Sequence, residues 1–169
     1  VFKASSEVAA LANHPALLLD FLATKDRESV VDKLREFPGT YGKWIESLES
    51  RLDEVVGEFS EIRDSIRDTA RSNIRKCQTI KDRILEGIDL LVTDDKVFMA
   101  FVAANRAMEK SMAISRPGVP PRWHPFQLAF LLLAIPSTAY GDNRARNVLD
   151  LIWFPTGGGK TEAYLGLVA

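Results

Sequence analysis

The segment Pro155-Thr-Gly-Gly-Gly-Lys-Thr161 holds the residues of this chain that are best suited to chemistry. Three consecutive glycines let the backbone wrap closely round a polyphosphate with its N–H groups pointing inward. A helix that begins near Lys160 adds the positive end of its dipole at the same place. The segment is therefore typical of a phosphate-binding loop, in which Lys160 reaches the β- and γ-phosphates and the hydroxyl of Thr161 ligates Mg²⁺.

A phosphate-binding loop requires a strand before it and a helix after it. The apolar run Val148–Phe154 has the length of a strand, and residues 162–169 read as a helix. The sequence therefore predicts the order strand, loop, helix, and the alternative is a tight turn that binds nothing. Asp150 and Glu162 flank the loop, and we interpret them as residues that cap or pair locally rather than as catalytic carboxylates.

The loop lacks the leading glycine of the generic pattern, because Phe154 stands five places before Gly159. A Pro-Thr-Gly-x-Gly-Lys-Thr loop of this kind resembles motif I of superfamily 2 helicases. Those enzymes also carry an upstream glutamine that contacts adenine, and Gln127 in Trp123-His-Pro-Phe-Gln127 resembles that element, with His124 in place of the usual arginine. A glutamine amide suits adenine because it can donate and accept at once. The alternative for Gln127 is a solvent-exposed helix residue.

The helicase resemblance implies ATP and Mg²⁺ as cofactors and a set of site residues. Lys160 would be the catalytic residue, which stabilises charge on the transferred phosphoryl group, and Thr161 would be the metal ligand. The cofactor would be bound by Gln127, Thr156, Gly157, Gly158, Gly159, Lys160 and Thr161.

Three stretches narrow the resemblance further: residues 100–108, 123–132 and 151–167. They resemble the DrmA family, the large helicase-like subunits of bacterial DISARM antiphage systems, and this likeness covers about residues 60–169. It implies an ATP-hydrolysing, DNA-binding helicase or translocase that works with a DrmB-like subunit and with the rest of its own helicase core. Two alternatives remain: a helical protein-interaction module, or an ATP-driven DNA-binding switch that does not unwind DNA.

Composition and length bound these possibilities. The chain has 169 residues, of which 46% are hydrophobic and 27% charged, as in a soluble globular protein of about one domain. The net charge of −1 gives no overall field that would attract nucleic acid or a membrane.

A single cysteine, Cys77, excludes an intrachain disulfide, and no apolar run is long enough to cross a bilayer, so we expect a cytoplasmic protein. The first residue is not methionine and the last lies in a helical pattern, so we expect a piece of a larger protein.

We predict a mainly α-helical chain in three parts. Residues 1–115 form a helical module, residues 116–124 a proline-rich linker, and residues 125–169 the start of a RecA-like α/β ATPase domain. Apolar residues between Ile45 and Leu91 recur at steps of three and four, which predicts a long amphipathic helix. At 1.5 Å per residue it would be roughly 70 Å long, so we allow for a break near Gly57 or at an irregular step between Ile66 and Cys77.

Prolines and a capping residue predict the remaining helix ends, and the spacing of four arginines predicts a charged stripe. We expect the Pro38-Gly39 pair to interrupt the first helices, Thr93 to cap a helix that runs to Ile114, and Pro125 to begin a helix that stops at Pro136. Four arginines recur every fourth residue, at Arg63, Arg67, Arg71 and Arg75. They would suit a DNA backbone, but Asp64 and Asp68 lie at ion-pair spacing, which favours a solvated helix face.

One prediction concerns catalysis by the 169 residues alone. Phosphoryl transfer also needs an acidic metal-binding and water-positioning motif and an arginine finger, and only eight residues follow Thr161. We therefore expect the isolated chain to release no phosphate from ATP. Phosphate release above that of a Lys160→Ala control would contradict this expectation.

Overall fold

The computed structural model describes residues 11, 13–57, 63–152 and 159–169, and these are mainly helical, as predicted. Within the described ranges every helix is too short or too polar to cross a bilayer. The elements follow the order η1 (Pro15–Leu17), α2 (Leu19–Leu22), α3 (Arg27–Gly57), α4 (Arg63–Thr93), α5 (Asp95–Ser115), α6 (Pro125–Ala139), η2 (Arg144–Asn147) and α7 (Lys160–Val168).

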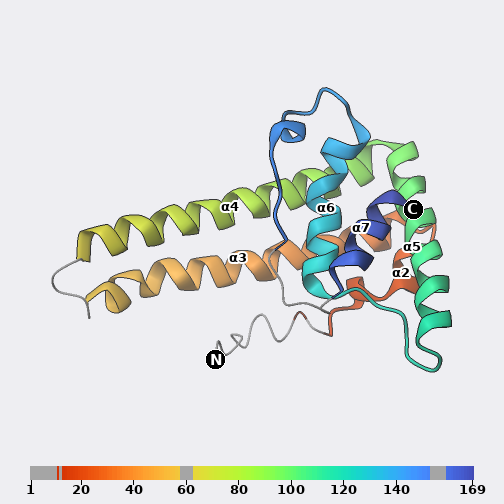
Figure 1. Ribbon diagram of the computed structural model, residues 1–169, viewed down its shortest axis with the longest axis horizontal. Helices are drawn as coiled ribbons and strands as arrows, with labels where there is room; N and C mark the ends of the chain where they lie inside the picture. Colours follow the sequence, from red (N-terminus) through yellow and green to blue (C-terminus); the bar gives the residue numbers. More distant parts are fainter. Residues whose placement is uncertain (1–10, 12, 58–62, 153–158) are drawn as a thin grey trace.

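Helices α3 and α4 lie side by side and antiparallel, and one end of the pair projects away from the other helices (Figure 1). The predicted break is confirmed at Gly57, where α3 ends, whereas α4 runs without interruption through the step between Ile66 and Cys77. Ile45 on α3 and Ile74 on α4 are both buried. A single helix would have left the apolar seam uncovered, so pairing of its two halves is favoured by the burial of apolar surface.

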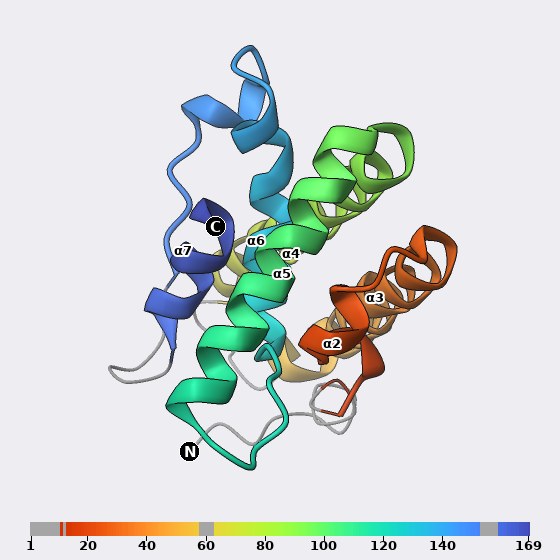
Figure 2. The same ribbon diagram turned by 90° about the vertical axis from the view of Figure 1, so that its right-hand side faces the viewer.

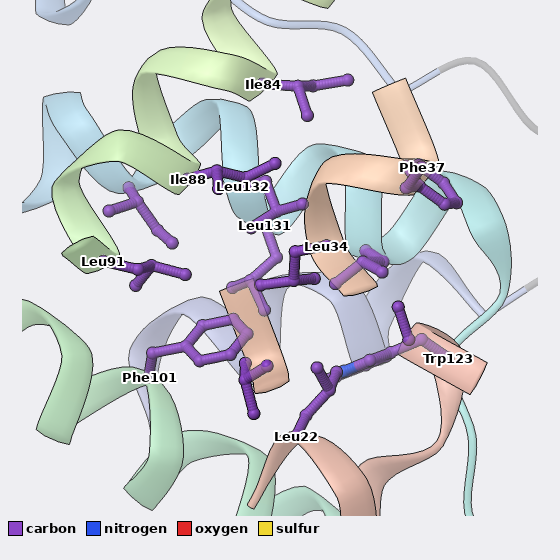
Figure 3. Packing of buried hydrophobic residues seen from close by; sticks show 14 of the residues in the cluster. Leu22, Leu34, Phe37, Ile84, Ile88, Leu91, Phe101, Trp123, Leu131 and Leu132 are labelled. Atoms are coloured by element: carbon purple, nitrogen blue, oxygen red, sulfur yellow. The ribbon is translucent and has the colours of Figure 1, made fainter. Parts of the chain in front are cut away.

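The core lies at the opposite end of this hairpin, where α2, α5, α6 and α7 gather around it (Figure 2). Side chains from five helices meet there, among them Leu22, Leu34, Ile88, Phe101 and Leu132 (Figure 3). All five are less than 5% exposed. The helices predicted for the start of the ATPase domain therefore pack directly on those of the helical module.

Two prolines lie inside helices, which corrects our expectation that they end them. Pro38 lies within α3 and Pro136 within α6, and both are buried. A proline inside a helix removes one backbone hydrogen bond and costs ~3 kcal/mol or more. Burial of apolar neighbours on the same helices, such as Phe37 and Leu133, offsets this cost.

The residue that caps α5 is Asp94 rather than Thr93. The Asp94 carboxylate accepts hydrogen bonds from the backbone N–H groups of Lys96 and Val97, while Thr93 ends α4. A hydroxyl group also donates to this carboxylate, from Tyr140 just after α6. The pKa of Asp94 lies below its usual value, mainly because of the bond from Tyr140 and then because of the bond from Val97.

The linker between α5 and α6 is non-helical, as predicted, and its last part is tied down by Trp123. The indole of Trp123 is 2% exposed, and its Nε1 donates to Oδ1 of buried Asn105 at 2.8 Å. The backbone N–H of Trp123 donates to the carbonyl of Leu17 at 2.8 Å. On the other side Gly166 of α7 lies so close that a Cβ there would be 2.6 Å from the indole. Trp123 therefore joins α5, α7 and the N-terminal helices.

The backbones of α4 and α6 approach one another most closely at Gly87. A Cβ placed on Gly87 would lie 1.9 Å from the carbonyl oxygen of Leu132. Because that oxygen belongs to the backbone, no side-chain rotation can relieve the clash. Only glycine fits at this crossing without moving one of the two helices.

We predict that Gly87→Ala destabilises the chain by about 1–3 kcal/mol, because α4 and α6 must separate to accept the methyl group. Gly39→Ala is the matched control: Gly39 lies in α3, and a Cβ there meets no atom within 4 Å. That substitution should stabilise by up to ~1 kcal/mol through helix propensity. Urea denaturation measures both, and equal midpoints for the two variants would disprove the tight crossing.

Candidate nucleotide-binding site

The end of the glycine loop is held in a left-handed turn that leads into a helix. Gly159 has φ 84° and is the N-cap of α7, which begins at Lys160. This backbone conformation strains any residue with a Cβ, so glycine is the residue that suits it. The helix predicted after the loop is confirmed, whereas Thr156, Gly157 and Gly158 lie outside the described residues.

The two predicted chemical groups of the loop stand in the first turn of α7. Lys160 is half-buried and Thr161 is exposed. The N-terminus of a helix carries partial positive charge and unpaired N–H groups, which favours an anion at this place. Glu162 also lies in this first turn. The roles of Lys160 and Thr161 in ATP and metal binding stay predictions.

Gln127 lies in the first turn of α6 and reaches the glycine loop. Its Nε2 donates to the carbonyl oxygen of Gly159 at 2.6 Å, and its Oε1 accepts from the backbone N–H of His124 at 2.7 Å. The residue is 2% exposed, so the alternative of a solvent-exposed helix residue is wrong. The structure thus brings together two predicted site residues that are 32 positions apart. Both polar groups of the amide are engaged, so contact with adenine would replace one of these bonds.

Helix α7 is fixed against α6 and Trp123, which sets the position of the loop's last residues. Ala163 and Gly166 are its buried residues, and Tyr164 meets Phe130 of α6 edge to face with ring centroids 5.5 Å apart. Edge-to-face aromatic pairs add about 0.5–1.5 kcal/mol beyond the burial of their area. The helix that carries Lys160 and Thr161 therefore has defined contacts on the core side.

The segment before the loop differs from its predicted form. Residues 148–152 carry no strand, because the described residues contain no neighbouring strand to supply ladder hydrogen bonds. Residues 153 and 154 of the predicted strand lie outside the described residues. Asp150 is also not paired locally: its two carboxylate oxygens accept from Nη1 and Nη2 of Arg83 on α4, both at 2.6 Å.

Arg83 is the residue near the site that sequence reasoning missed. Its hydrogen bonds to Asp150, followed by the nearby charges of Asp150 and Glu86, raise the pKa of the Arg83 guanidinium. The two partners are 67 positions apart, so no spacing rule for helices or turns connects them. The charge count of the sequence alone contains no signal that would single out this pair.

Of the two ion pairs expected on the arginine stripe of α4, the pair of Arg67 with Asp64 is present and that of Arg71 with Asp68 is not. Arg67 forms an ion pair with Asp64 at 3.8 Å, three residues away, while Arg71 and Arg75 are exposed. Cys77, which we expected in the apolar seam, is half-buried. In the described ranges no three histidine, cysteine or acidic residues gather as potential metal ligands.

Comparison with known proteins adds one relative. No family model matches the chain. The chain is 33% identical over 165 residues to the DISARM protein DrmA of Bacillus paralicheniformis (strain ATCC 9945a / NCIMB 11709 / CD-2), and the match covers 88% of the chain. The chain is related to DrmA. The match therefore extends beyond residues 60–169, the part of the chain on which the resemblance was based. It spans 14% of the relative's length.

We predict that Gln127→Glu loosens the start of α7 while leaving the start of α6 capped. A carboxylate still accepts from the His124 N–H but cannot donate to the Gly159 carbonyl. Amides in the first turns of α7 should exchange with deuterium several-fold to about tenfold faster, as expected for the loss of one hydrogen bond.

Gln78→Glu on α4 is the control, since Gln78 forms no hydrogen bond that ties it to the loop. It should leave exchange in α7 unchanged. Equal protection of α7 in wild type and in Gln127→Glu would show that the bond to Gly159 does not hold the loop.

Proposed function

We propose that the full-length protein containing this chain is an ATP-dependent, helicase-like component of DISARM antiphage defence. The observation that carries the proposal is the contact of Gln127 with Gly159, which joins the two predicted nucleotide-binding elements at the N-terminus of α7. Relationship to DrmA supports the link to the DISARM system. Residues 125–169 would then be the start of a RecA-like ATPase domain.

Each site residue has a proposed task that follows from its chemistry. The amides of residues 157–161 surround the phosphates, and Lys160 stabilises charge on the transferred phosphoryl group. Thr161, an exposed residue, ligates Mg²⁺ through its hydroxyl. Gln127 reads adenine once its bond to Gly159 is exchanged for one to the base.

The partners that we propose follow the same relationship. The full-length protein acts on DNA in the cytoplasm, together with a DrmB-like subunit and the remainder of its own helicase core. We propose exposed Arg71 and Arg75, rather than ion-paired Arg67, as the residues of the arginine stripe that contact a phosphate backbone.

We expect the full-length protein to bind Mg-ATP in calorimetry and Lys160→Ala to weaken binding by about 10–100-fold, the range for loss of hydrogen bonds to a charged group. Thr161→Ala should weaken binding only when Mg²⁺ is present. Lys110→Ala, which removes an exposed lysine of α5, is the matched control and should bind as wild type. Equal affinity of wild type and Lys160→Ala would refute the proposed nucleotide site.

A second function is favoured by the projecting α3–α4 hairpin, whose far end lies away from the core (Figure 1). The chain would then be a protein-interaction module in which the loop is incidental. The titration above separates the two functions, because a module predicts no effect of Lys160→Ala. A strand-displacement assay with the full-length protein distinguishes a helicase from an ATP-driven switch.

A further inference from the structure

Among residues 148–151, which lead toward the glycine loop, Asp150 is the side chain that turns onto the helices. Val148, Leu149 and Leu151 are 52%, 94% and 82% exposed, so they do not attach the segment to the core. The side chain of Asp150 is only 25% exposed and turns the other way, onto Arg83 of α4. The ion pair is therefore what attaches residues 148–151 to α4, and half-buried Ile152 follows it.

We propose that Arg83 and Asp150 form a positioning pair for nucleotide binding, which holds the entry of the glycine loop against α4. The inference rests on the proposed ATP-binding function of that loop. Neither residue touches the phosphates in this role. They act through the position of the backbone that follows Asp150.

The geometry of the Arg83–Asp150 pair fixes the position and orientation of Asp150 in addition to attracting its charge. Two parallel bonds of 2.6 Å join both terminal nitrogens of Arg83 to both oxygens of Asp150. A planar fork on a carboxylate sets the orientation of the partner as well as its distance, which a lysine cannot do. The Arg83 side chain is 13% exposed, and its Nε is buried with no hydrogen-bond partner. Asp150 is therefore the hydrogen-bonded partner that compensates the charge of this guanidinium, and the nearby charge of Glu86 adds to it.

The pair is anchored to the same rigid unit that holds the other end of the loop. Arg83 lies one helical turn before Gly87, where α4 meets the backbone of α6 at Leu132. The first turn of α6 in turn carries Gln127, which binds Gly159. The joined helices α4 and α6 thus hold the loop before its first glycine through Asp150 and at its last glycine through Gln127. A change at either contact would alter how Asp150 and Gly159 lie relative to each other.

The test uses Asp150→Asn and Arg83→Lys in the full-length protein, with Mg-ATP affinity by calorimetry and KM and kcat of ATP hydrolysis. Both variants keep their volume but lose the charged fork. We expect affinity to fall and KM to rise by roughly tenfold, because the charged fork no longer holds the entry of the loop, with kcat changed less. The charge reversal Arg83→Asp with Asp150→Arg should recover part of the affinity lost in either single reversal.

The matched control is Arg35→Ala, which removes an exposed ion pair between α3 and Asp89 of α4 with a bond of 3.2 Å. It should leave affinity and KM unchanged, and melting temperatures of all variants show which of them remain folded. Wild-type affinity in folded Asp150→Asn and Arg83→Lys, together with the weakened binding of Lys160→Ala, overturns the positioning role alone. A wild type that binds no Mg-ATP refutes the proposed function itself.

Discussion

The close approach of α4 and α6 at Gly87 is the constraint on which the candidate site depends. With backbone against backbone at Leu132, the two helices have little freedom to slide or separate. Helix α4 carries Arg83 a turn earlier, and α6 carries Gln127 in its first turn. Two side chains from distant parts of the sequence therefore project from one rigid pair of helices toward the two ends of the glycine loop.

The second structural centre is Trp123, which lets a proline-rich linker serve as part of the core. Its indole fills the space between α5 and α7, and its N–H group is paired with Asn105 in an otherwise apolar environment. A buried donor without a partner costs about 1–3 kcal/mol, so Asn105 favours one orientation of the ring. Because Gly166 packs on that ring, the orientation of Trp123 also sets the place of α7, the helix that begins at Lys160.

Burial of apolar faces overrode two of the helix breaks that the sequence predicted. Pro38 and Pro136 have the local chemistry of helix breakers, yet both lie within helices whose apolar faces are buried. The opposite happened at residues 148–152, where an apolar run of strand length forms no strand. A strand is stabilised by its neighbours, and the described residues supply none. Local propensity decides between two conformations of a segment only when both conformations bury similar apolar surface.

The sequence by itself determined the helical class, the turn into a helix at Gly159, the helix start at Pro125 and the relationship to DrmA, because these depend on local residue types and short spacings. The tertiary structure decided which groups meet: Gln127 with Gly159, Arg83 with Asp150, and the two halves of the apolar seam with each other. Such pairs are 32 or more positions apart or lie on different helices. Their contact follows from the helix crossing at Gly87, whose tightness no local pattern encodes.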